Sequence, residues 1–220
     1  MSDILQRLFY PKAVAIIGAS NDAMKIGGRP IAHNRELGFS GRIYPVNPGA
    51  TEIQGWKAYP SVQEIPDELD CAIIAVPAAS VPAAVAGCAE KRVPLVIVLS
   101  SGFAEQGDEG RRVQDRLVDI ARASGMRLLG PNTMGGVSID GSFSATFTSL
   151  TQSQGKEGWP RRGNVSVVSQ SGAIGTQILV LLRERGIGVA KWVSTGNQCD
   201  IDVADCIEHL ANDEVTRVIA

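Results

Sequence analysis

The sequence predicts an α/β fold built from two successive doubly wound units. Short, continuous runs of Val, Ile and Leu recur along the chain, which is typical of parallel strands covered on both faces. Stretches with the apolar spacing of helices separate these runs. Regular alternation of strand and helix is the pattern of βαβ units, so both sheets are expected to be largely parallel.

The first unit is expected to contain five strands and to end at about residue 150. The expected strands are residues 13–17, 42–46, 71–76, 95–99 and 127–129. Ser80 is a candidate N-cap for a helix that has Pro82 in its first turn. One helical face of the segment DEGRRVQDRLVDIARASG carries Val113, Leu117, Ile120, Ala121 and Ser124. Gly125 is suited to end that helix.

A second α/β pattern follows a polar, Gly-rich segment, residues 151–163, which we interpret as a linker. The expected elements are a strand at 164–168, a helix at 173–185 ended by Gly186, a strand at 189–193 and a helix at 202–211. A third strand begins in the final residues, TRVIA. A sheet that stops in mid-strand buries its faces poorly, so we expect a continuation, a partner subunit or self-association to complete it.

The composition is that of an ordinary globular protein. Hydrophobic residues make up 44% of the chain, charged residues 20%, and the formal net charge is −2. Aromatic residues are only 5% and no basic patch is evident, so no nucleic-acid partner is expected. No apolar run approaches ~18 residues, and the N-terminus MSDILQRLF lacks a signal-type core. We therefore expect no membrane association and a cytoplasmic location.

The four cysteines point to buried thiols. They are Cys71, Cys88, Cys199 and Cys206, and none forms a C-x-x-C pair. Cys71 lies in an apolar strand run, and Cys88 fits the core face of a helix. Only His33 and His209 could assist a metal site, so reduced, buried cysteines are favoured over zinc, and no metal is expected.

The stretch VAIIGASNDAMKIGG indicates a phosphate-binding loop. Its strand ends at Gly18, which permits a tight turn, and the N-terminus of the following helix attracts anions. A nicotinamide dinucleotide site calls for G-x-G-x-x-G, but Ser20 and Ala23 stand at two of the glycine positions. Lys25 adds a point charge suited to a phosphate.

The end of the second strand argues further against a dinucleotide. It reads YPVNP and presents Asn47, where a carboxylate would hold the ribose diol. These features favour another phosphate-bearing ligand of the adenine type. Two alternatives stay open: Gly18, Gly27 and Gly28 are packing glycines beside a solvated Lys25, or the chain is an NAD-dependent oxidoreductase.

Six stretches together resemble one family. LFYPKAVAIIGAS, GRIYPVNP, AIIAVPA, VLSSGFAE, LLGPNTMGG and VSVVSQSGAIG follow in the order seen in NDP-forming acyl-CoA synthetases. These are the acetate–CoA ligases (ADP-forming), which are related to the succinyl-CoA synthetase alpha subunit. The resemblance implies a Rossmann-like CoA-binding domain followed by the first part of a flavodoxin-like ligase domain. It also implies a carboxylic acid, CoA and NTP as substrates, acyl-CoA, NDP and phosphate as products, and an ATP-grasp domain or subunit as partner.

The resemblance also implies site residues. Those for coenzyme A are the phosphate loop of Gly18, Ala19, Ser20 and Lys25, the adenosine rim of Val46, Asn47 and Pro48, and the cleft wall of Val76 and Pro77. Ser100, Ser101, Gly102 and Phe103 are implied beside the pantetheine arm, and Pro131 and Asn132 near the thiol. Ser169, Gln170, Ser171 and Gly172 are implied to face a transferred phosphoryl group.

These assignments differ in how well the residues alone support them. The family often has a lysine directly after Pro48, where this chain has Gly49, so the resemblance does not carry that phosphate contact over to this chain. Val76–Pro77 could equally be a strand end, and Gly130–Pro131–Asn132 alone would be an ordinary turn. The stretch SQSG has physical support of its own, because small hydroxyl residues between a strand and a long helix leave N–H groups for an anion.

No catalytic residue is assigned within the chain. In this family a phosphorylated histidine in an S-H-T-G-A-type loop carries the phosphoryl group, and a histidine suits that role because its nitrogen is nucleophilic near neutral pH. His33 belongs to the first helix of the CoA domain, and His209 is expected to be solvated among Asp205, Glu208 and Asp213. The 220 residues are therefore not expected to turn over alone. A CoA-sensing regulatory module of an acetyltransferase is the alternative function.

Overall fold

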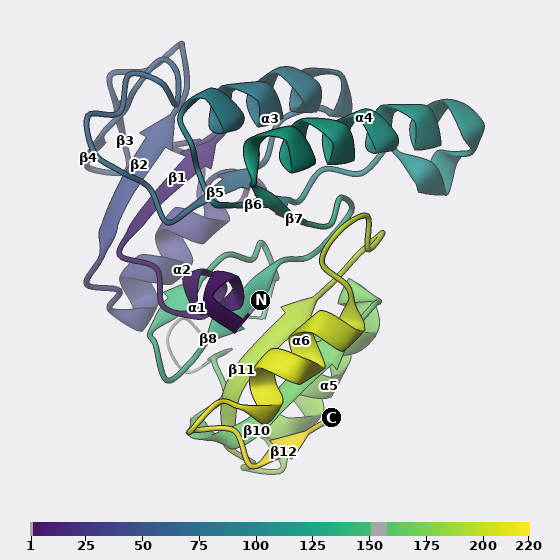
Figure 1. Cartoon of the computed structure of the whole chain (residues 1–220). Coiled ribbons are helices and arrows are strands. Elements are labelled where there is room, and N and C mark those ends of the chain that lie inside the picture. Colours follow the sequence, from purple (N-terminus) through teal and green to yellow (C-terminus); the bar gives the residue numbers. More distant parts are fainter. Residues whose placement is uncertain (1, 151–157) are drawn as a thin grey trace.

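Two β-sheets organise the protein, and a computed structural model describes residues 2–150 and 158–220 (Figure 1). The first sheet has the order β2-β1-β5-β6-β7, and all its strands are parallel. Its strands are β1 (Ala13–Ile17), β2 (Arg42–Val46), β5 (Cys71–Ile74), β6 (Leu95–Val98) and β7 (Arg127–Leu129). Three of the five have the expected bounds, while β5 and β6 end two residues and one residue earlier than predicted.

Helices cover both faces of this first sheet because its strands are apolar on both sides. Val14 and Ile16 pack toward α1 (Ser2–Phe9) and α2 (Arg29–Leu37). Ala15 and Ile17 pack toward the opposite layer. That layer is formed by α3 (Val81–Glu90) and α4 (Asp108–Ser124), preceded by the short turns η1 (Ala78–Ser80) and η2 (Ala104–Gln106) (Figure 1).

The strand order creates a crevice at one edge of the sheet. Strand β1 lies between β2 and β5, and the connections on its two sides run over opposite faces. At such a switch point the loops that follow neighbouring strands diverge and leave room for a ligand. A small hairpin, β3 (Glu52–Ile53) and β4 (Trp56–Lys57), takes the place of a helix between β2 and β5.

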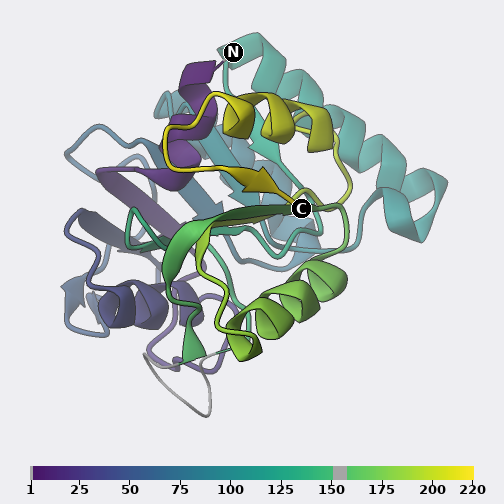
Figure 2. The ribbon, with the colours of Figure 1, turned by 90° about the horizontal axis from the view of Figure 1, so that it is seen from below.

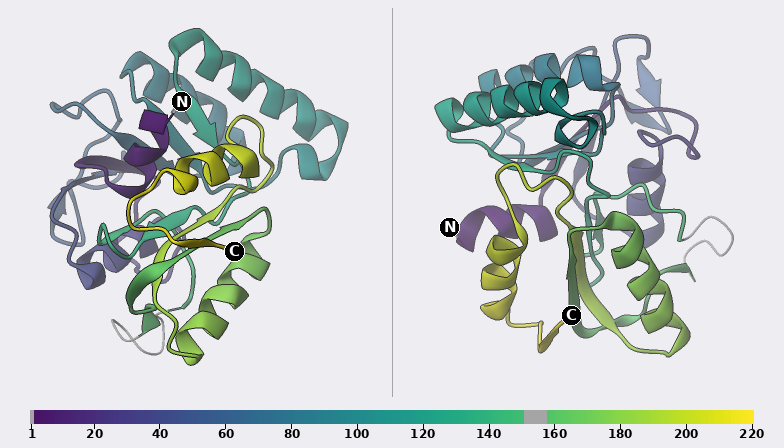
Figure 3. Two further views of the ribbon diagram at one scale, coloured as in Figure 1. Left: turned by 60° about the horizontal axis from the view of Figure 1, so that its bottom comes forward. Right: turned by 90° about the vertical axis from the view of Figure 1, so that its right-hand side faces the viewer.

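The second sheet has the order β12-β10-β11-β8-β9. Its strands are β8 (Gly136–Ser138), β9 (Phe143–Ser144), β10 (Arg162–Ser169), β11 (Val189–Ser194) and β12 (Val218–Ile219). β11 and β12 are parallel to β10, whereas β8 is antiparallel to β11 and β9 to β8. Helices α5 (Gly172–Glu184) and α6 (Val203–Ala211) lie on opposite faces (Figure 3).

The structure differs from the expected division of the chain. The first unit was expected to reach about residue 150, but β8 and β9 hydrogen-bond to the second sheet through β11. The expected linker, 151–163, can be followed only in part, because residues 151–157 lie outside the described residues. β10 already begins at Arg162, within that segment.

Local signals determine several helix ends. Gly125 adopts φ 73° and ends α4, as predicted, and Asp202 forms a capping box with Asp205 at the start of α6. Ser80 stands at the N-cap of α3, as predicted, but its side chain makes no cap bond. Ser124, at the end of the predicted face of α4, is exposed. None of the helices in the described part of the chain has the length and apolar run that a bilayer-spanning segment needs.

The expected burial of the cysteines is confirmed in most cases. Cys71, Cys88 and Cys206 are buried, and Cys199 is half-buried. Burial raises the pKa of the Cys88, Cys199 and Cys206 thiols to about 12. All four are therefore protonated and unreactive at neutral pH.

Candidate functional site

The loop that follows β1 begins at Gly18, which no other residue could replace without backbone strain. Gly18 has φ +85°, and its N–H donates to the carbonyl of Val46 at 3.0 Å. A Cβ atom there would lie 2.6 Å from the Ala75 carbonyl oxygen. The chain thus passes closely between the ends of β2 and β5, where the crevice opens.

The rest of this loop, residues 18–28, closes upon itself. A Cβ on Gly27 would lie 1.9 Å from the Gly18 carbonyl oxygen, and one on Gly28 would lie 2.0 Å from that of Asp22. Both glycines are therefore packing glycines, which the sequence left open. Gly28 and Arg29 donate their N–H groups to the Lys25 carbonyl, so part of the N-terminus of α2 is already satisfied.

Gln54, at the tip of the β3–β4 hairpin, holds this loop in place. Its side-chain Nε2 donates to the carbonyls of Ser20 and Gly28, each at 2.9 Å. Its backbone N–H donates to Asn21 Oδ1 at 2.7 Å. The sequence analysis missed Gln54, because the Gln-Gly pair signals a turn but says nothing of what the turn touches.

A cleft of about 370 Å³ opens beside the loop at the switch point. Five of the predicted residues line it: Gly18, Val46, Asn47, Pro48 and Val76. The remaining lining residues are mostly small or apolar: Ile17, Pro60, Ser61, Val62, Gln63, Ala83, Ala84 and Gly87. No carboxylate is among these described lining residues, in agreement with the absence of a ribose-binding acid after β2.

The other residues predicted for the phosphate loop lie around this cleft. Ala19 is 1% exposed and acts through its carbonyl, which accepts from Asn47 Nδ2 at 2.9 Å. Ser20 is half-buried, and its hydroxyl accepts from the Asp22 N–H. Lys25 is exposed and has no ion-pair partner among the described residues. The loop thus carries one exposed cation without an ion pair among the described residues, although neither Ser20 nor Lys25 lines the cleft itself.

A second cleft, of about 390 Å³, lies between α3 and α4 and includes the predicted Gly102 and Phe103. The Phe103 side chain is fully buried, so the turn presents its backbone rather than this ring. Ser100 lies between residues of the two clefts: its hydroxyl donates at 2.5 Å to the carbonyl of Val76, which lines the first cleft, and Gly102 of the second cleft follows two residues later. Ser101 and Pro77 are exposed on the same edge of the sheet.

The turn after β7 joins the first sheet to the second. The Asn132 N–H donates to the Ser100 carbonyl at 2.8 Å, and the Pro131 carbonyl accepts from the Asn197 N–H at 2.9 Å. Asn197 belongs to the loop between β11 and α6. In the same loop the Gly196 carbonyl accepts a hydrogen bond from Gln170 Nε2 at 2.8 Å. The structure therefore brings together three predicted stretches, 100–103, 131–132 and 169–172, through the loop at 196–197.

The 169–172 loop has the geometry of a capped helix start. Ser171 Oγ accepts from the Ile174 N–H at 3.4 Å, and Ser169 Oγ donates to the Ser171 carbonyl at 2.8 Å. A Cβ on Gly172 would lie 2.3 Å from the side chain of Met134, two residues after Asn132. The N-terminus of α5 therefore faces the junction of the two sheets, where an anion would be favoured.

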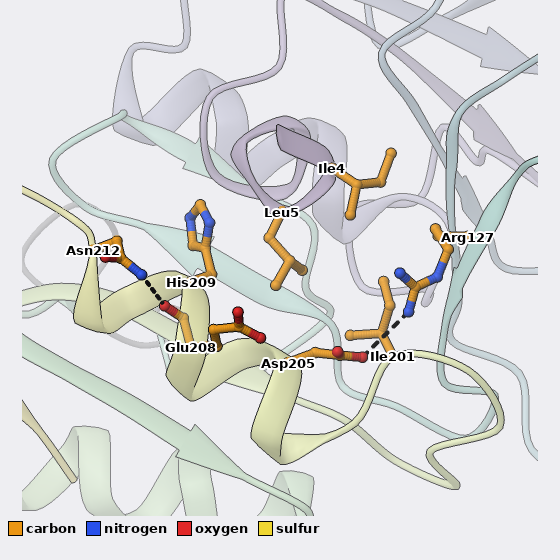
Figure 4. Close-up of a pocket in the computed structure, with 8 residues that line it drawn as sticks. All are labelled: Ile4, Leu5, Arg127, Ile201, Asp205, Glu208, His209 and Asn212. Carbon is orange, nitrogen blue, oxygen red and sulfur yellow. Dashed lines mark hydrogen bonds and ion pairs between the residues drawn. The ribbon is translucent and has the colours of Figure 1, made fainter. Parts of the chain in front are cut away.

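Neither histidine is available for chemistry at this junction. His33 is 3% exposed, and its Nδ1 lies 3.1 Å from the Thr146 carbonyl. His209 is 8% exposed and stacks on Phe9 with the ring centroids 5.6 Å apart. The expected solvation of His209 is wrong, because its ring lies on the side of α6 that packs against α1 (Figure 4). Helices α1 and α6 lie side by side in the molecule (Figure 2).

A small cavity lies beside His209 between two helices, and it is too small for a substrate. It holds about 30 Å³, and residues of α1 and α6 surround it together with Arg127 (Figure 4). Arg127 forms ion pairs with Asp200 at 2.8 Å and Asp205 at 3.2 Å across its rim. Such a volume has room for about one water molecule.

Comparison with known proteins agrees with this geometry. Residues 12–138 match the family described as "CoA binding domain", and residues 162–220 match "Succinyl-CoA ligase like flavodoxin domain". The alpha subunit of acetate–CoA ligase [ADP-forming] II from Pyrococcus furiosus is 41% identical over 99% of this chain and 45% of its own length. Acetate–CoA ligase [ADP-forming] I from Archaeoglobus fulgidus is 41% identical over 98% of this chain and 30% of its own.

A solved structure shows the same arrangement. Acetyl-coenzyme A synthetase 1 of Ca. Korarchaeum cryptofilum, in complex with phosphate and ADP, is 37% identical, with a TM-score of 0.91 over 100% of this chain and 45% of that one. The present chain thus spans about half, or less, of the length of these relatives. The predicted fold class is confirmed, and the chain belongs to the CoA-binding domain family, with the domain arrangement of the NDP-forming acyl-CoA synthetases.

Proposed function

We propose that this chain binds coenzyme A for an NDP-forming acyl-CoA synthetase, which joins a carboxylic acid to CoA with conversion of NTP to NDP and phosphate. The observation that carries the proposal is a chain of hydrogen bonds between the first cleft and the 169–172 loop. It runs from the cleft residue Val76 through the turns at Ser100 and at 131–132 to the 196–197 loop, which accepts from Gln170. A ligase of this kind needs the thiol and the phosphoryl group close together.

The first cleft fits the adenosine end of coenzyme A. Its walls are apolar at Val46, Pro48 and Val76, which suits a flat purine ring, and Ser61 and Gln63 offer hydrogen bonds. Lys25 supplies a positive charge for phosphate at the mouth. The described walls carry no carboxylate, which is the group that would bind the ribose of a nicotinamide dinucleotide.

From this cleft the pantetheine arm has a direct course to the junction. Ser100 connects the end of β5 to the turn after β6, and Asn132 connects that turn to the second sheet. Bound CoA supplies the thiol that receives the acyl group. Residues of the chain bind and orient it, while Ser169, Gln170, Ser171 and Gly172 hold the phosphoryl group at the start of α5.

The remaining parts of the reaction come from outside this chain. His33 and His209 are both buried, so a phosphorylated histidine and the nucleotide site are supplied by another segment or subunit. We assign the phosphorylated histidine to an S-H-T-G-A-type loop of the flavodoxin-like domain and the nucleotide site to an ATP-grasp domain or subunit. We place the activity in the cytoplasm. Two of the relatives are named as alpha subunits, which supports assembly with a second kind of subunit.

Calorimetry with CoA and with NADH tests the proposal. We expect the protein to bind CoA and to give no saturable heat with NADH. Ala83 is exposed on α3 and lines the first cleft, so Ala83→Trp fills the cleft from the surface and should abolish CoA binding. Ala211→Trp, at an exposed position of α6, is the matched control and should bind CoA normally.

The opposite results would overturn the proposal. If the folded protein binds NADH but not CoA, an oxidoreductase-type site is indicated. If Ala83→Trp binds CoA as well as Ala211→Trp does, the ligand occupies another part of the molecule. Circular dichroism of both variants checks that neither loss reflects unfolding.

A further inference from the structure

Two side chains that the sequence analysis passed over link the parts of the site. Glu105 Oε1 accepts the N–H groups of Gly102 at 2.5 Å and Phe103 at 3.1 Å. Its other oxygen, Oε2, accepts from Asn197 Nδ2 at 2.5 Å. Glu105 belongs to the first unit and Asn197 to the second, so this contact crosses between the two sheets.

Asn197 hydrogen-bonds to three segments at the junction: the turn at 131–132, helix α4 and the turn that contains Glu105. Its backbone N–H donates to the Pro131 carbonyl, and its Oδ1 accepts from Asn132 Nδ2 at 3.3 Å. Its Nδ2 also donates to Gln114 Oε1 on α4 at 2.9 Å. The preceding residue, Gly196, accepts the bond from Gln170 of the phosphoryl loop.

The backbone around this pair leaves little freedom. Gly196 has φ +60°, and a Cβ there would lie 2.5 Å from the Pro131 carbonyl oxygen. Bonds to the carboxylate from Asn197 and from the backbone outweigh burial and hold the pKa of Glu105 below its usual range, so the acceptor is charged at neutral pH. Hydrogen bonds to a charged acceptor are stronger than neutral ones, which suits a contact on the rim of a cleft.

We propose that Glu105 and Asn197 are a positioning pair that sets the thiol end of coenzyme A relative to the 169–172 loop. The inference rests on the proposed function. Neither side chain is required to touch the reacting atoms. Glu105 orients the N–H groups of the 102–103 turn, and Asn197 ties that turn to the 131–132 turn. The adjacent Gly196 carbonyl accepts from Gln170, so the position of Asn197 also bears on the 169–172 loop.

The pair should affect the pantetheine arm without affecting the nucleotide end. The first cleft, where the adenosine end is placed, contains neither Glu105 nor Asn197 among its lining residues. Loss of the pair should therefore weaken the binding of whole CoA but not of adenosine 3′,5′-bisphosphate, which lacks the arm. A purely structural role would weaken both ligands together or neither.

The test is calorimetry of both ligands with Asn197→Ala, Glu105→Gln and Glu105→Ala. We expect the Kd for CoA to rise about tenfold in Asn197→Ala and Glu105→Ala, and less in Glu105→Gln, which keeps an acceptor oxygen. The Kd for the bisphosphate should stay within about twofold of the unchanged protein. The double variant Asn197→Ala with Glu105→Ala should lose less than the sum of the two single variants, since both single variants remove the contact between the two side chains.

Asp108→Asn is the control, because it removes one negative charge three residues from Glu105 at an exposed position. Three outcomes would each overturn the inference: equal losses for CoA and the bisphosphate, additive losses in the double variant, or no loss for CoA. In each case the proposal that the unchanged protein binds CoA would still stand. If the unchanged protein binds neither ligand, the proposed function fails and the inference fails with it.

Discussion

His33 is a titratable side chain held in a position where its charged form is disfavoured. It packs edge-on against Trp159, with the ring centroids 5.2 Å apart, and lies close to the Thr146 carbonyl. Burial, and to a smaller extent the charge of Arg29, lower its pKa from 6.5 to about 4, against the opposing effect of the bond to Thr146. The ring is therefore neutral in the folded protein at neutral pH.

The depressed pKa of His33 predicts a loss of stability in mild acid. Because the unfolded chain binds a proton near pH 6.5 and the folded protein does not, this contribution is complete above that pH and falls as the pH drops toward 4. We expect the free energy of unfolding to fall by about 2 kcal/mol between about pH 7.5 and pH 5 from this group. Urea denaturation at a series of pH values measures it.

His33→Gln separates this group from the carboxylates, which titrate mainly at lower pH. The variant should be less stable at neutral pH, but its stability should change less over the same interval. An equally steep pH dependence in His33→Gln would show that other groups cause the acid sensitivity.

At the scale of elements, the β3–β4 hairpin supports the ligand loop rather than the core of the sheet. Gln54 stands at the tip of this hairpin with φ 49°, and its side-chain amide donates to two carbonyls of the 18–28 loop. The loop is otherwise held mostly by bonds among its own residues. Its position over the first cleft therefore depends on a contact between segments about 30 residues apart in sequence.

Gln54→Ala should loosen the loop and weaken CoA binding while leaving the fold intact. Both side-chain bonds are lost, but alanine keeps the Cβ at the same φ, so backbone strain is unchanged. We expect about 1 kcal/mol less stability and a several-fold higher Kd for CoA. Calorimetry and amide hydrogen exchange of residues 18–28 measure the two effects.

Gln177→Ala, an exposed position on α5, is the matched control and should change neither quantity. Faster exchange of residues 18–28 without any change in CoA affinity would mean that the loop does not contact the ligand. Unchanged exchange would mean that Gln54 does not hold the loop.

At the scale of the whole molecule, a buried lysine joins the N-terminal helix region to the second sheet. Lys191 on β11 is 0% exposed and pairs with Asp213 at 2.8 Å and Asp140 at 3.2 Å. Tyr10 donates its hydroxyl to Asp140, and its ring centroid lies 5.0 Å from Lys191 Nζ. Burial opposes the charge of Lys191, but the bonds to Asp213 and Tyr10 and the charge of Asp140 raise its pKa above the usual value.

Lys191→Met should destabilise the protein strongly because it leaves two largely buried carboxylates without their cation. We expect a loss of about 3–5 kcal/mol in the free energy of unfolding, measured by urea denaturation at neutral pH. Adding Asp213→Asn to Lys191→Met should recover part of the loss, since one uncompensated charge is removed.

Lys12→Met is the control, because Lys12 is exposed and has no ion pair among the described residues. It should change stability by less than about 0.5 kcal/mol. A similarly small effect of Lys191→Met would show that the network contributes little, and no recovery on adding Asp213→Asn would argue against uncompensated charge as the cause.

Much of the architecture could be predicted from the sequence. The apolar runs of the parallel strands identified β1, β2 and β7 to the residue, and Gly18 and the SQSG stretch were found because each directly follows a buried strand. β8 and β9 were missed because they have only three and two residues, too few for any periodicity. Their antiparallel pairing depends on β11, about 50 residues later in the chain.

The chemistry-bearing stretches were predicted, but their connections were not. Nothing local marks Gln54, Glu105 or Asn197, although STGN after a buried strand is the kind of polar loop in which to look. His209 was misjudged for a related reason: acidic neighbours in sequence indicate a solvated helix face, yet the ring packs on Phe9 of α1.

By itself the sequence determined the alternation of strands and helices, the parallel first sheet, the parallel pairing of β10 with β11 and the loops that follow these strands, because apolar spacing and glycine turns are properties of a few neighbouring residues. The second sheet as a whole is mixed rather than largely parallel, because β8 and β9 join it antiparallel. Only the tertiary structure decided which sheet residues 136–144 join, that both histidines are buried and that three loops meet around Asn197. Those outcomes depend on hydrogen-bond partners and packing faces contributed by distant segments, which no local pattern specifies.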